Sequence, residues 1–279
     1  MHDERLVKDY LSSLPSSEID SFLESLSENA LLSLPWLFEH WAHDHQRQPE
    51  GDWKTWVIMG GRGAGKTRAG AEWVRNIAEG PTPEAEGKAK RIALIAETVD
   101  QARDVMVFGE SGIIACSPPD RAPVWKPTLK QLVWPNGTIA QVFSASSPES
   151  LRGPQFDAAW SDELAKWKKG RETWDMLQFA LRLGENPQQI VTTTPRDVKL
   201  LRDILAEDST VRSQAPTSAN EAYLADSFLQ HVEVKYGGTR LGRQELDGEL
   251  LTAAAGALWT HEGLDAQRLK DAPKLDRII

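Results

Sequence analysis

At 279 residues, the chain is long enough for one large α/β domain with appended segments. Its net charge of −9, from 32 basic and 41 acidic residues, argues against a uniformly basic nucleic-acid-binding surface, although a local basic stripe would suffice for DNA contact. The single cysteine, Cys116, excludes an internal disulfide and fits a reducing cytosol, and no apolar run or N-terminal h-region suggests a membrane span or signal peptide.

The first 45 residues are expected to be helical and separate from the core that follows. Apolar residues recur at helical spacing up to Leu26, with Ser16 as a helix start, and a second helical stretch covers residues 31–45. Three histidines close this stretch, at positions 40, 43 and 45. Their spacings do not place all three on one helix face, so a solvated helix end is favoured over the alternative of a metal site.

A strand, a glycine-rich loop and a helix follow one another at residues 56–78. Residues 56–59 are a short β-prone run, the next eight read GGRGAGKT, and residues 67–78 carry apolar side chains at helical spacing. This is the context that the phosphate-binding P-loop motif requires, because the backbone N–H groups of such a loop surround a phosphate chain. Lys66 can reach the β and γ oxygens, and the Thr67 hydroxyl can bind Mg²⁺. The sequence therefore predicts nucleoside triphosphate binding by Gly60, Gly61, Arg62, Gly63, Ala64, Gly65, Lys66 and Thr67.

Further strands and helices alternate after this unit. Residues 91–96 form a buried strand candidate, and Thr98 with Gln101 forms a capping box for a helix that ends near Phe108. Residues 117–127 are rich in proline and are expected to be an excursion. Four more runs are predicted strands: 132–134 and 138–143, which form a hairpin around Asn136-Gly137, then 156–161 and 189–193, with a long helix ending near Gly184 between the last two.

This alternation indicates an α/β fold with a mostly parallel sheet covered by helices on both faces. From about residue 220 the chain becomes helical and polar again, and small residues after Thr252 form a linker. We expect four parts: an N-terminal helical segment (1–45), the core (46–215), a helical lid (216–252) and a linker (253–279).

Asp162 and Glu163 stand where the strand at 156–161 ends. Hydrolysis of a triphosphate needs a second contact to Mg²⁺ and a group that orients the attacking water. An aspartate at a strand end can hold the metal, and an adjacent glutamate can polarise the water. A bare Asp-Glu pair is usually surface, but its place after a hydrophobic run downstream of a P-loop favours the catalytic interpretation. Small-molecule kinases need no such glutamate, so the pair indicates an ATPase.

Thr192, Thr193 and Thr194 close the next predicted strand. Hydroxyls at the C-terminal end of a parallel strand face the ligand crevice, where they could sense the γ-phosphate and relay its loss. The alternative is that β-branched residues simply favour strands. Beside the other two motifs, a coupling role is the favoured interpretation.

Charge that builds on the γ-phosphoryl group needs an arginine, which can come from the same or a neighbouring subunit. Arg62, Arg103, Arg121 and Arg152 are candidates, and the sequence does not choose among them. Gln48, just upstream of the first strand, could read the adenine edge.

Together these motifs resemble the ATPase half of a large terminase, the DNA-packaging motor of tailed phages and phage-like gene transfer agents. The likeness covers about residues 45–260. It rests on GGRGAGKTRAGAEW at Gly60–Trp73, SLRGPQFDAAWSDELAKW at Ser150–Trp167, TTTPR at Thr192–Arg196 and YGGTRLGRQELDGE at Tyr236–Glu249.

The resemblance implies a P-loop NTPase fold of the ASCE/RecA-like type and ATP-driven movement of double-stranded DNA into a viral or gene-transfer-agent procapsid. Carried onto this sequence, Lys66 and Thr67 hold phosphate and Mg²⁺, Asp162 holds the metal, Glu163 activates water and Thr192–Thr194 couples hydrolysis to movement. Arg62 is similar to the basic residue that the family often places in the loop.

The resemblance further implies a ring of subunits docked on a portal protein, with a small terminase subunit that chooses the DNA. The isolated chain as a monomer is the alternative to the ring. Such a motor works in the cytoplasm of the bacterial host, docks transiently on the procapsid and is not expected in the mature particle. The family also carries a C-terminal nuclease domain, and the chain ends at about its first strand, 275–279, so we expect no DNA cleavage.

Another DNA translocase or a helicase-like P-loop ATPase is the alternative function. A tandem helicase would need two RecA-like cores, and only one P-loop core fits in the chain. The candidates for DNA contact are Arg196, Lys199 and the lysines at 166, 168 and 169, for which a solvated helix face is the favoured alternative.

Overall fold

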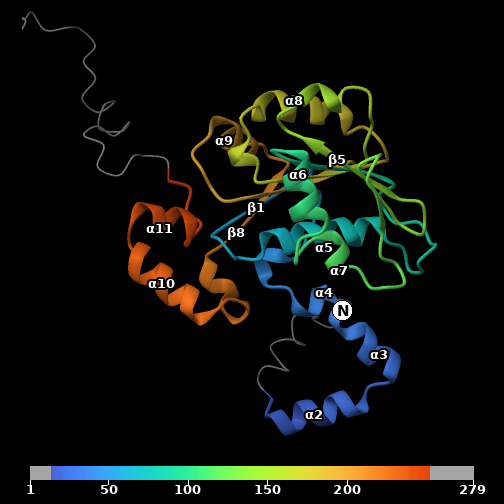
Figure 1. Ribbon diagram of the computed structural model, residues 1–279, viewed down its shortest axis with the longest axis vertical. Helices are drawn as coiled ribbons and strands as arrows, with labels where there is room; N and C mark the ends of the chain where they lie inside the picture. Colours follow the sequence, from blue (N-terminus) through green and yellow to red (C-terminus); the bar gives the residue numbers. More distant parts are fainter. Residues whose placement is uncertain (1–13, 252–279) are drawn as a thin grey trace, which may run out of the picture.

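The computed structural model describes residues 14–251, which fold around an eight-stranded sheet (Figure 1). The strand order is β3-β4-β5-β2-β6-β7-β1-β8. The strands from β5 to β8 in this order pair in parallel, and β3 and β4 add an antiparallel edge. The strands are β1 (Thr55–Gly60), β2 (Arg91–Ala96), β3 (Val124–Lys126), β4 (Gln131–Val133), β5 (Ile139–Ser144), β6 (Ala158–Asp162), β7 (Gln188–Thr193) and β8 (Thr210–Ala215). This confirms the predicted α/β class.

Helices cover both faces of the sheet, and further helices lie beyond one of its ends. The α-helices are α2 (Ser16–Ser25), α3 (Glu28–Ser33), α4 (Phe38–Trp41), α5 (Lys66–Ala78), α6 (Val99–Gln101), α7 (Ile113–Cys116), α8 (Gly170–Ala180), α9 (Lys199–Leu205), α10 (Asp226–Tyr236) and α11 (Arg240–Glu245). Short 3-10 turns are η1 (Leu34–Trp36), η2 (Asp44–Gln46), η4 (Pro148–Leu151), η5 (Leu164–Lys166) and η6 (Thr217–Tyr223), and η3 (Ala102–Val107) is a π-helix. None of these helices is both long and apolar enough to cross a membrane.

Alternate residues of the central strands feed two separate hydrophobic clusters. In β1, Trp56 and Ile58 join the cluster that contains the buried face of α5, whereas Val57 and Met59 join the cluster beneath α8 and α9. Figure 1 shows α8 and α9 on one side of the sheet and α5 and α7 on the other. Side chains alternate across a strand, so a strand in a sheet that is covered on both faces is buried at every position, as β1 is. Such a strand needs a nearly continuous apolar run rather than alternating apolar and polar residues.

The helix after the glycine-rich loop lies very close to the sheet. A Cβ atom added at Gly70 of α5 would meet the indole of Trp160 at 2.3 Å, so only glycine allows this approach. Trp160 is fully buried on β6. The contact fixes the height of α5, and therefore of the loop at its N-terminus, above β6 and β7.

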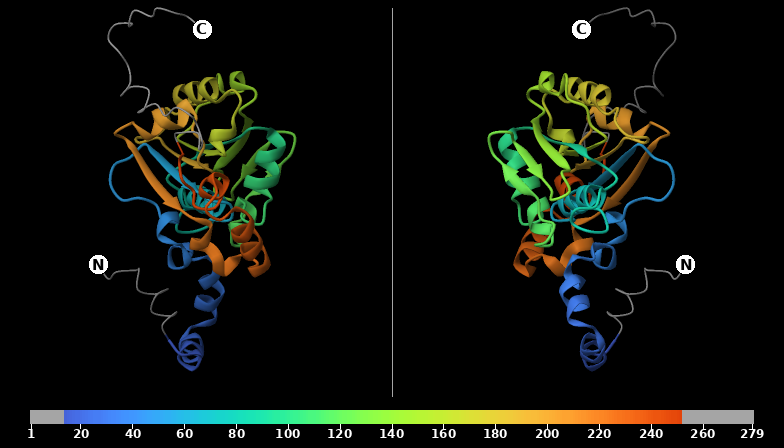
Figure 2. Two further views of the ribbon diagram at one scale, coloured as in Figure 1. Left: turned by 90° about the vertical axis from the view of Figure 1, so that its left-hand side faces the viewer. Right: turned by 90° about the vertical axis from the view of Figure 1, so that its right-hand side faces the viewer.

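The N-terminal segment is not separate from the core as expected: its first helices extend away from the sheet, but Trp36, His45 and Gln46 contact α5 or the glycine-rich loop. Two further views show α2 and α3 extending away from the sheet, while α10 and α11 lie beside the core (Figure 2). No residue of α2 is buried. The expected helix over 31–45 is wrong, because Pro35 lies in the 3-10 turn η1 and Leu37 leaves helical geometry, so the stretch breaks into η1, α4 and η2.

Other boundaries also differ from the sequence-based expectation. Thr98 does accept the predicted cap bond, from the amide of Gln101 at 3.2 Å, but the helix that follows is mostly the π-helix η3. The proline-rich excursion contains β3, which forms by pairing with β4. The strand β8 and the helix α9 were not predicted. The expected linker after Thr252 and the strand at 275–279 lie outside the described residues.

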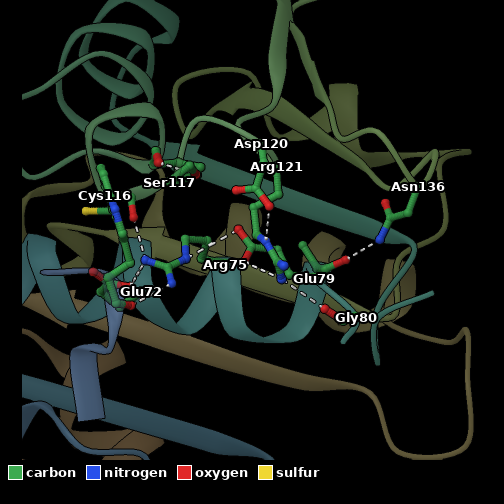
Figure 3. Close-up of polar contacts among 12 residues, drawn as sticks. Glu72, Arg75, Glu79, Gly80, Cys116, Ser117, Asp120, Arg121 and Asn136 are labelled. Carbon is green, nitrogen blue, oxygen red and sulfur yellow. Dashed lines mark hydrogen bonds and ion pairs between the residues drawn. The ribbon is translucent and has the colours of Figure 1, made fainter. Parts of the chain in front are cut away.

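An ion network ties the outer face of α5 to its neighbours (Figure 3). Arg75, only 12% exposed, contacts Glu72 at 2.7 Å and Glu79 at 3.3 Å. The same guanidinium donates to the carbonyl of Cys116 and, at 3.0 Å, to that of Trp36 in the N-terminal segment. Burial raises the pKa of Glu72 and of Glu79, and the charge of Arg75 opposes this rise in both. Arg75 therefore holds two buried carboxylates and two chain segments to the P-loop helix.

We expect Arg75→Met to lower the free energy of unfolding by about 2–4 kcal/mol, because Glu72 loses one of its two arginines inside the protein. Urea unfolding measures the change. Lys90→Met is the matched control, since the Lys90–Glu86 pair is 62% and 71% exposed and is expected to contribute less than about 1 kcal/mol. Equal effects of the two substitutions would contradict a stabilising role for Arg75.

Candidate active site

Three sequence motifs meet at one edge of the sheet. β7 lies between β6 and β1 and pairs in parallel with both, so the carboxyl ends of the three strands lie side by side. In the register, Asp162 is opposite Thr192, and Met59 is opposite Thr193. The glycine-rich loop continues directly from β1 at Gly60. The acidic pair, the threonines and the loop, far apart in the sequence, thus share one site.

The loop has the conformation of a phosphate cradle. Gly63 and Gly65 have φ angles of 76° and 80°, which side chains strongly disfavour, and α5 begins at the next residue, Lys66. Lys66 is 8% exposed, and its Nζ donates to the carbonyls of Gly60 at 3.0 Å and Gly61 at 2.8 Å. Burial lowers the pKa of Lys66, while the nearby Glu163 and Asp162 raise it. The ammonium group therefore sits over the loop, and a phosphate chain would be a stronger partner than the carbonyls.

Asp162 is buried at the end of β6. Its Oδ1 accepts a hydrogen bond from the Thr192 hydroxyl at 2.6 Å, and that hydroxyl in turn accepts from Nε1 of Trp160 at 2.8 Å. Burial raises the pKa of Asp162 to about 6, the Thr192 bond opposes this, and Glu163 adds to it. The carboxylate thus lacks the positive charge that would fully compensate its burial.

Glu163 occupies a strained backbone position, with φ at 51°. Non-glycine residues in this region are uncommon and gather at functional sites. Its carboxylate pairs with Lys166 at 3.0 Å and lies 3.4 Å from both the hydroxyl and the amide of Thr194. The third threonine, Thr193, accepts from the amide of Ala165 at 3.2 Å. Each threonine of the triplet is therefore bonded to the segment that carries Asp162 and Glu163.

The four candidate arginines each have an acidic neighbour. The pairs are Arg62–Glu245 at 2.8 Å, Arg103–Asp104 at 2.7 Å, Arg121–Asp120 at 3.5 Å and Arg152–Glu149 at 3.0 Å. Arg62 lies in the loop itself and is 66% exposed. Arg121 donates to the carbonyl of Gly80, beyond the far end of α5, and so lies roughly 20 Å from the loop along the helix. Within one subunit, Arg121 does not reach the site.

A cavity of about 610 Å³ adjoins the loop at Gly65. Its walls come from the N-terminal segment, from α5 and from the chain after β8, and they include Phe38, Trp41, His43, Gln46, Arg68, Asn220 and Tyr223. Gln46 is buried, and its Nε2 donates to the carbonyl of Gly65 at 3.0 Å. Gln48 instead lines a small recess beside α5, with Trp56 and Asn76. The glutamine in contact with the loop is therefore Gln46, two residues before the candidate that the sequence suggested.

The histidines at the end of the N-terminal segment do not form a solvated helix end. Nε2 of His45 donates to the carbonyl of Ala64, 2.7 Å away, and Nε2 of His43 lies 3.1 Å from Oδ1 of Asn220. Residues 14–251 contain no group of three or more His, Cys, Asp or Glu side chains that could hold a metal ion. The sequence pattern offered no signal for these contacts, because Ala64 and Asn220 are distant along the chain.

A family model described as the large terminase subunit of T4likevirus type, N-terminal, matches residues 57–265. No curated protein is significantly similar in sequence to the chain. Several solved structures are similar in fold. The large terminase of a thermophilic bacteriophage has 12% sequence identity and a TM-score of 0.58, over 79% of this chain and 53% of that one.

Two other structures show the same relation. The large terminase ATPase domain of Thermus phage P74-26 is 14% identical, with a TM-score of 0.55 over 75% of this chain and 94% of that domain. The large terminase of bacteriophage HK97 is 18% identical, with a TM-score of 0.52 over 70% of this chain and 46% of that one. The chain thus spans about half the length of the thermophilic-phage and HK97 proteins and nearly the whole of an isolated ATPase domain.

We expect Thr192→Val to lower the free energy of unfolding by about 1–3 kcal/mol, because it leaves Nε1 of Trp160 and the Asp162 carboxylate without their shared partner. Urea unfolding is the measurement. Thr210→Val is the matched control: this strand threonine has a buried hydroxyl without a partner among the described residues, so its removal is expected to be nearly neutral. A Thr192→Val protein as stable as the control would show that the bridge contributes nothing.

Proposed function

The chain belongs to the T4likevirus-type large terminase subunits, and on that premise we propose that it hydrolyses ATP to drive double-stranded DNA into a viral procapsid. The observation that supports hydrolysis most strongly is the convergence of the P-loop, the Asp162-Glu163 pair and the threonine triplet at one sheet edge. Structures of the thermophilic-phage large terminase with ADP and with ATP-gamma-S accord with nucleotide as the ligand.

The residues at the sheet edge fit a magnesium nucleotide. Mg²⁺ prefers oxygen ligands and, when bound, would neutralise charge on the phosphates of a triphosphate. The hydroxyl of Thr67, on the first turn of α5, and the carboxylate of Asp162 would hold it. The raised pKa of Asp162 supports this assignment, since a buried carboxylate short of positive charge is suited to a cation.

Glu163 is proposed as the group that orients and activates the attacking water. Its backbone lies in the left-handed region, and contacts with Lys166 and Thr194 restrict where its carboxylate can lie. A carboxylate held in this way can accept the proton of a water aligned with the γ-phosphate. Thr194 contacts that same carboxylate, so a movement of Glu163 would pass directly to the end of β7. This is the basis for assigning coupling to Thr192–Thr194.

The nucleoside is proposed to enter the 610 Å³ cavity beside Gly65. The cavity adjoins the loop that would hold the phosphates, and its walls combine aromatic and polar side chains, as nucleotide pockets commonly do. Gln46, already in contact with the loop, is better placed than Gln48 to meet the base. All four arginines are kept as candidates for stabilising charge on the γ-phosphoryl group: Arg62 lies in the loop itself, whereas Arg121, at the far end of α5, would have to act on a neighbouring subunit.

We also propose the partners and the assembly in which this chain would act. A ring docked on a portal, a small terminase subunit that selects DNA, and a site of action in the bacterial cytoplasm follow from the family. Within the chain, Lys166 is engaged with Glu163 and Lys199 with Asp203, which leaves Lys168, Lys169 and Arg196 as exposed candidates for DNA contact. We retain the division into residues 1–45, 46–215, 216–252 and 253–279 as the proposed domain organisation.

We expect Glu163→Gln to lower kcat for ATP hydrolysis by about 10²- to 10⁴-fold, because an amide cannot accept the proton of the attacking water. The dissociation constant for ADP should stay within about threefold, since the substitution is isosteric. Phosphate release and ADP titration measure the two quantities. Glu172→Gln, an exposed change on α8, is the control for loss of a negative charge. Turnover of the Glu163→Gln protein at the rate of the control would remove Glu163 from the mechanism.

A further inference from the structure

The outer face of the P-loop is covered by hydrogen bonds to four consecutive backbone carbonyls. The contacts are Thr217 Oγ1 to Arg62 O at 2.7 Å, Asn220 Nδ2 to Gly63 O at 2.7 Å, His45 Nε2 to Ala64 O at 2.7 Å and Gln46 Nε2 to Gly65 O at 3.0 Å. We call the four side chains the outer clamp. Two come from the segment before β1 and two from the segment after β8, so the clamp brings both ends of the core to the loop.

These contacts also orient the N–H groups of the loop, because each peptide bond is planar. In a trans peptide the C=O of one residue and the N–H of the next point in opposite directions. The backbone of the described residues has no cis peptides. Holding the carbonyls of Arg62, Gly63 and Ala64 outward therefore turns the N–H groups of the following residues toward the inside of the loop, where a phosphate chain would lie.

A second layer supports the clamp. Oδ1 of Asn220 lies 3.1 Å from Nε2 of His43, so this amide bridges the His43 ring and the Gly63 carbonyl. The rings of His43 and His45 are stacked, with centroids 5.6 Å apart and planes at 7°, and Tyr223 packs edge-on against His43. This layer restricts the positions of His45 and Asn220, and it gives the two histidines a use other than metal binding.

The protonation of His45 suits a donor role. A carbonyl can only accept, so the contact at Ala64 requires a proton on Nε2 of His45. Burial is the main cause that lowers the pKa of His45, which favours the neutral ring, and the Ala64 contact then places the single proton on Nε2. The groups that face this ring are His43, Asp44 and Lys66.

We propose that the outer clamp positions the P-loop amides for the phosphate chain, with His45, Asn220 and Thr217 as positioning residues for nucleotide binding. The inference rests on the proposed ATPase function of the loop. Although Gln46 and Asn220 also line the proposed base cavity, the clamp acts on the phosphates through the loop backbone. Its effect on affinity should therefore not depend on which base is attached.

Thr217→Val tests the clamp with the smallest change of shape, since the backbone N–H of residue 217 keeps its bond to the Leu246 carbonyl. We expect about a three- to tenfold rise in the dissociation constants for both ADP and inorganic pyrophosphate, from loss of one hydrogen bond. Thr138→Val is the matched control. Its buried hydroxyl also donates to carbonyls, those of Ala78 and Ala89, but at the opposite end of the sheet, so affinity should not change.

His45→Phe and His45→Gln test the donor separately from the ring. Phenylalanine keeps the stacking surface and removes the donor, whereas the glutamine amide can replace Nε2. We expect weaker binding of ADP and pyrophosphate, by about three- to tenfold, in His45→Phe and affinity within about twofold of the wild-type protein in His45→Gln. Should His45→Phe fail to fold, Thr217→Val decides alone.

The outcomes distinguish a failure of the outer clamp from a failure of the proposed ATPase function. A wild-type protein that binds neither ADP nor pyrophosphate would overturn the proposed function itself. Wild-type binding with unchanged affinity in Thr217→Val would overturn the clamp and leave the ATPase assignment intact. A lower melting temperature with unchanged affinity would likewise show that the contacts only stabilise the fold, because a purely structural bond does not alter phosphate affinity in the folded fraction.

Discussion

The parallel pairing of β6, β7 and β1 is the constraint on which the rest of the molecule depends. It places the end of each strand at one edge, so that a loop, an acidic pair and three hydroxyls from separate parts of the chain share one site. The hydroxyls lie within hydrogen-bonding distance of the segment that carries the acidic pair. The close packing of α5, at Gly70, against the indole of Trp160 then fixes the position of the loop relative to the acidic pair. The same indole donates to Thr192, which donates to Asp162, so the packing contact and the polar site are one structure.

The second feature of the site is that two charged side chains, Lys66 and Asp162, are buried without partners that fully compensate their charge. Burial lowers the pKa of Lys66 and raises that of Asp162, which means that both charged forms are disfavoured in the isolated chain. A triphosphate would supply the partner that Lys66 lacks, and a divalent cation the partner that Asp162 lacks. The site therefore gains most from binding both together. The outer clamp complements this arrangement, because it fixes the neutral donors of the loop while the charged groups remain undercompensated.

The sequence predicted the parts of the structure whose signals are local. The runs at β1 and β2 are nearly continuous and apolar, β6 and β7 each carry a shorter apolar run, the P-loop has a fixed spacing, and Thr98 caps its helix as expected. It did not predict β8, whose residues are only partly buried at the sheet edge and alternate with polar side chains. Contacts such as Asn220 to Gly63 or Thr217 to Arg62 join residues more than 150 positions apart, and no local pattern encodes them.

The most direct test is a crystal structure of this chain with Mg²⁺ and ATP-gamma-S. We expect the phosphates within hydrogen-bonding distance of the amides of residues 63–66, and Nζ of Lys66 moved from the Gly60 and Gly61 carbonyls to phosphate oxygens. The Thr67 hydroxyl and the Asp162 carboxylate should lie next to the metal ion, and the Glu163 carboxylate should face the γ-phosphate. A nucleotide bound elsewhere, or one bound at the loop while Lys66 keeps its carbonyl contacts, would contradict the assignment of this edge as the hydrolytic site.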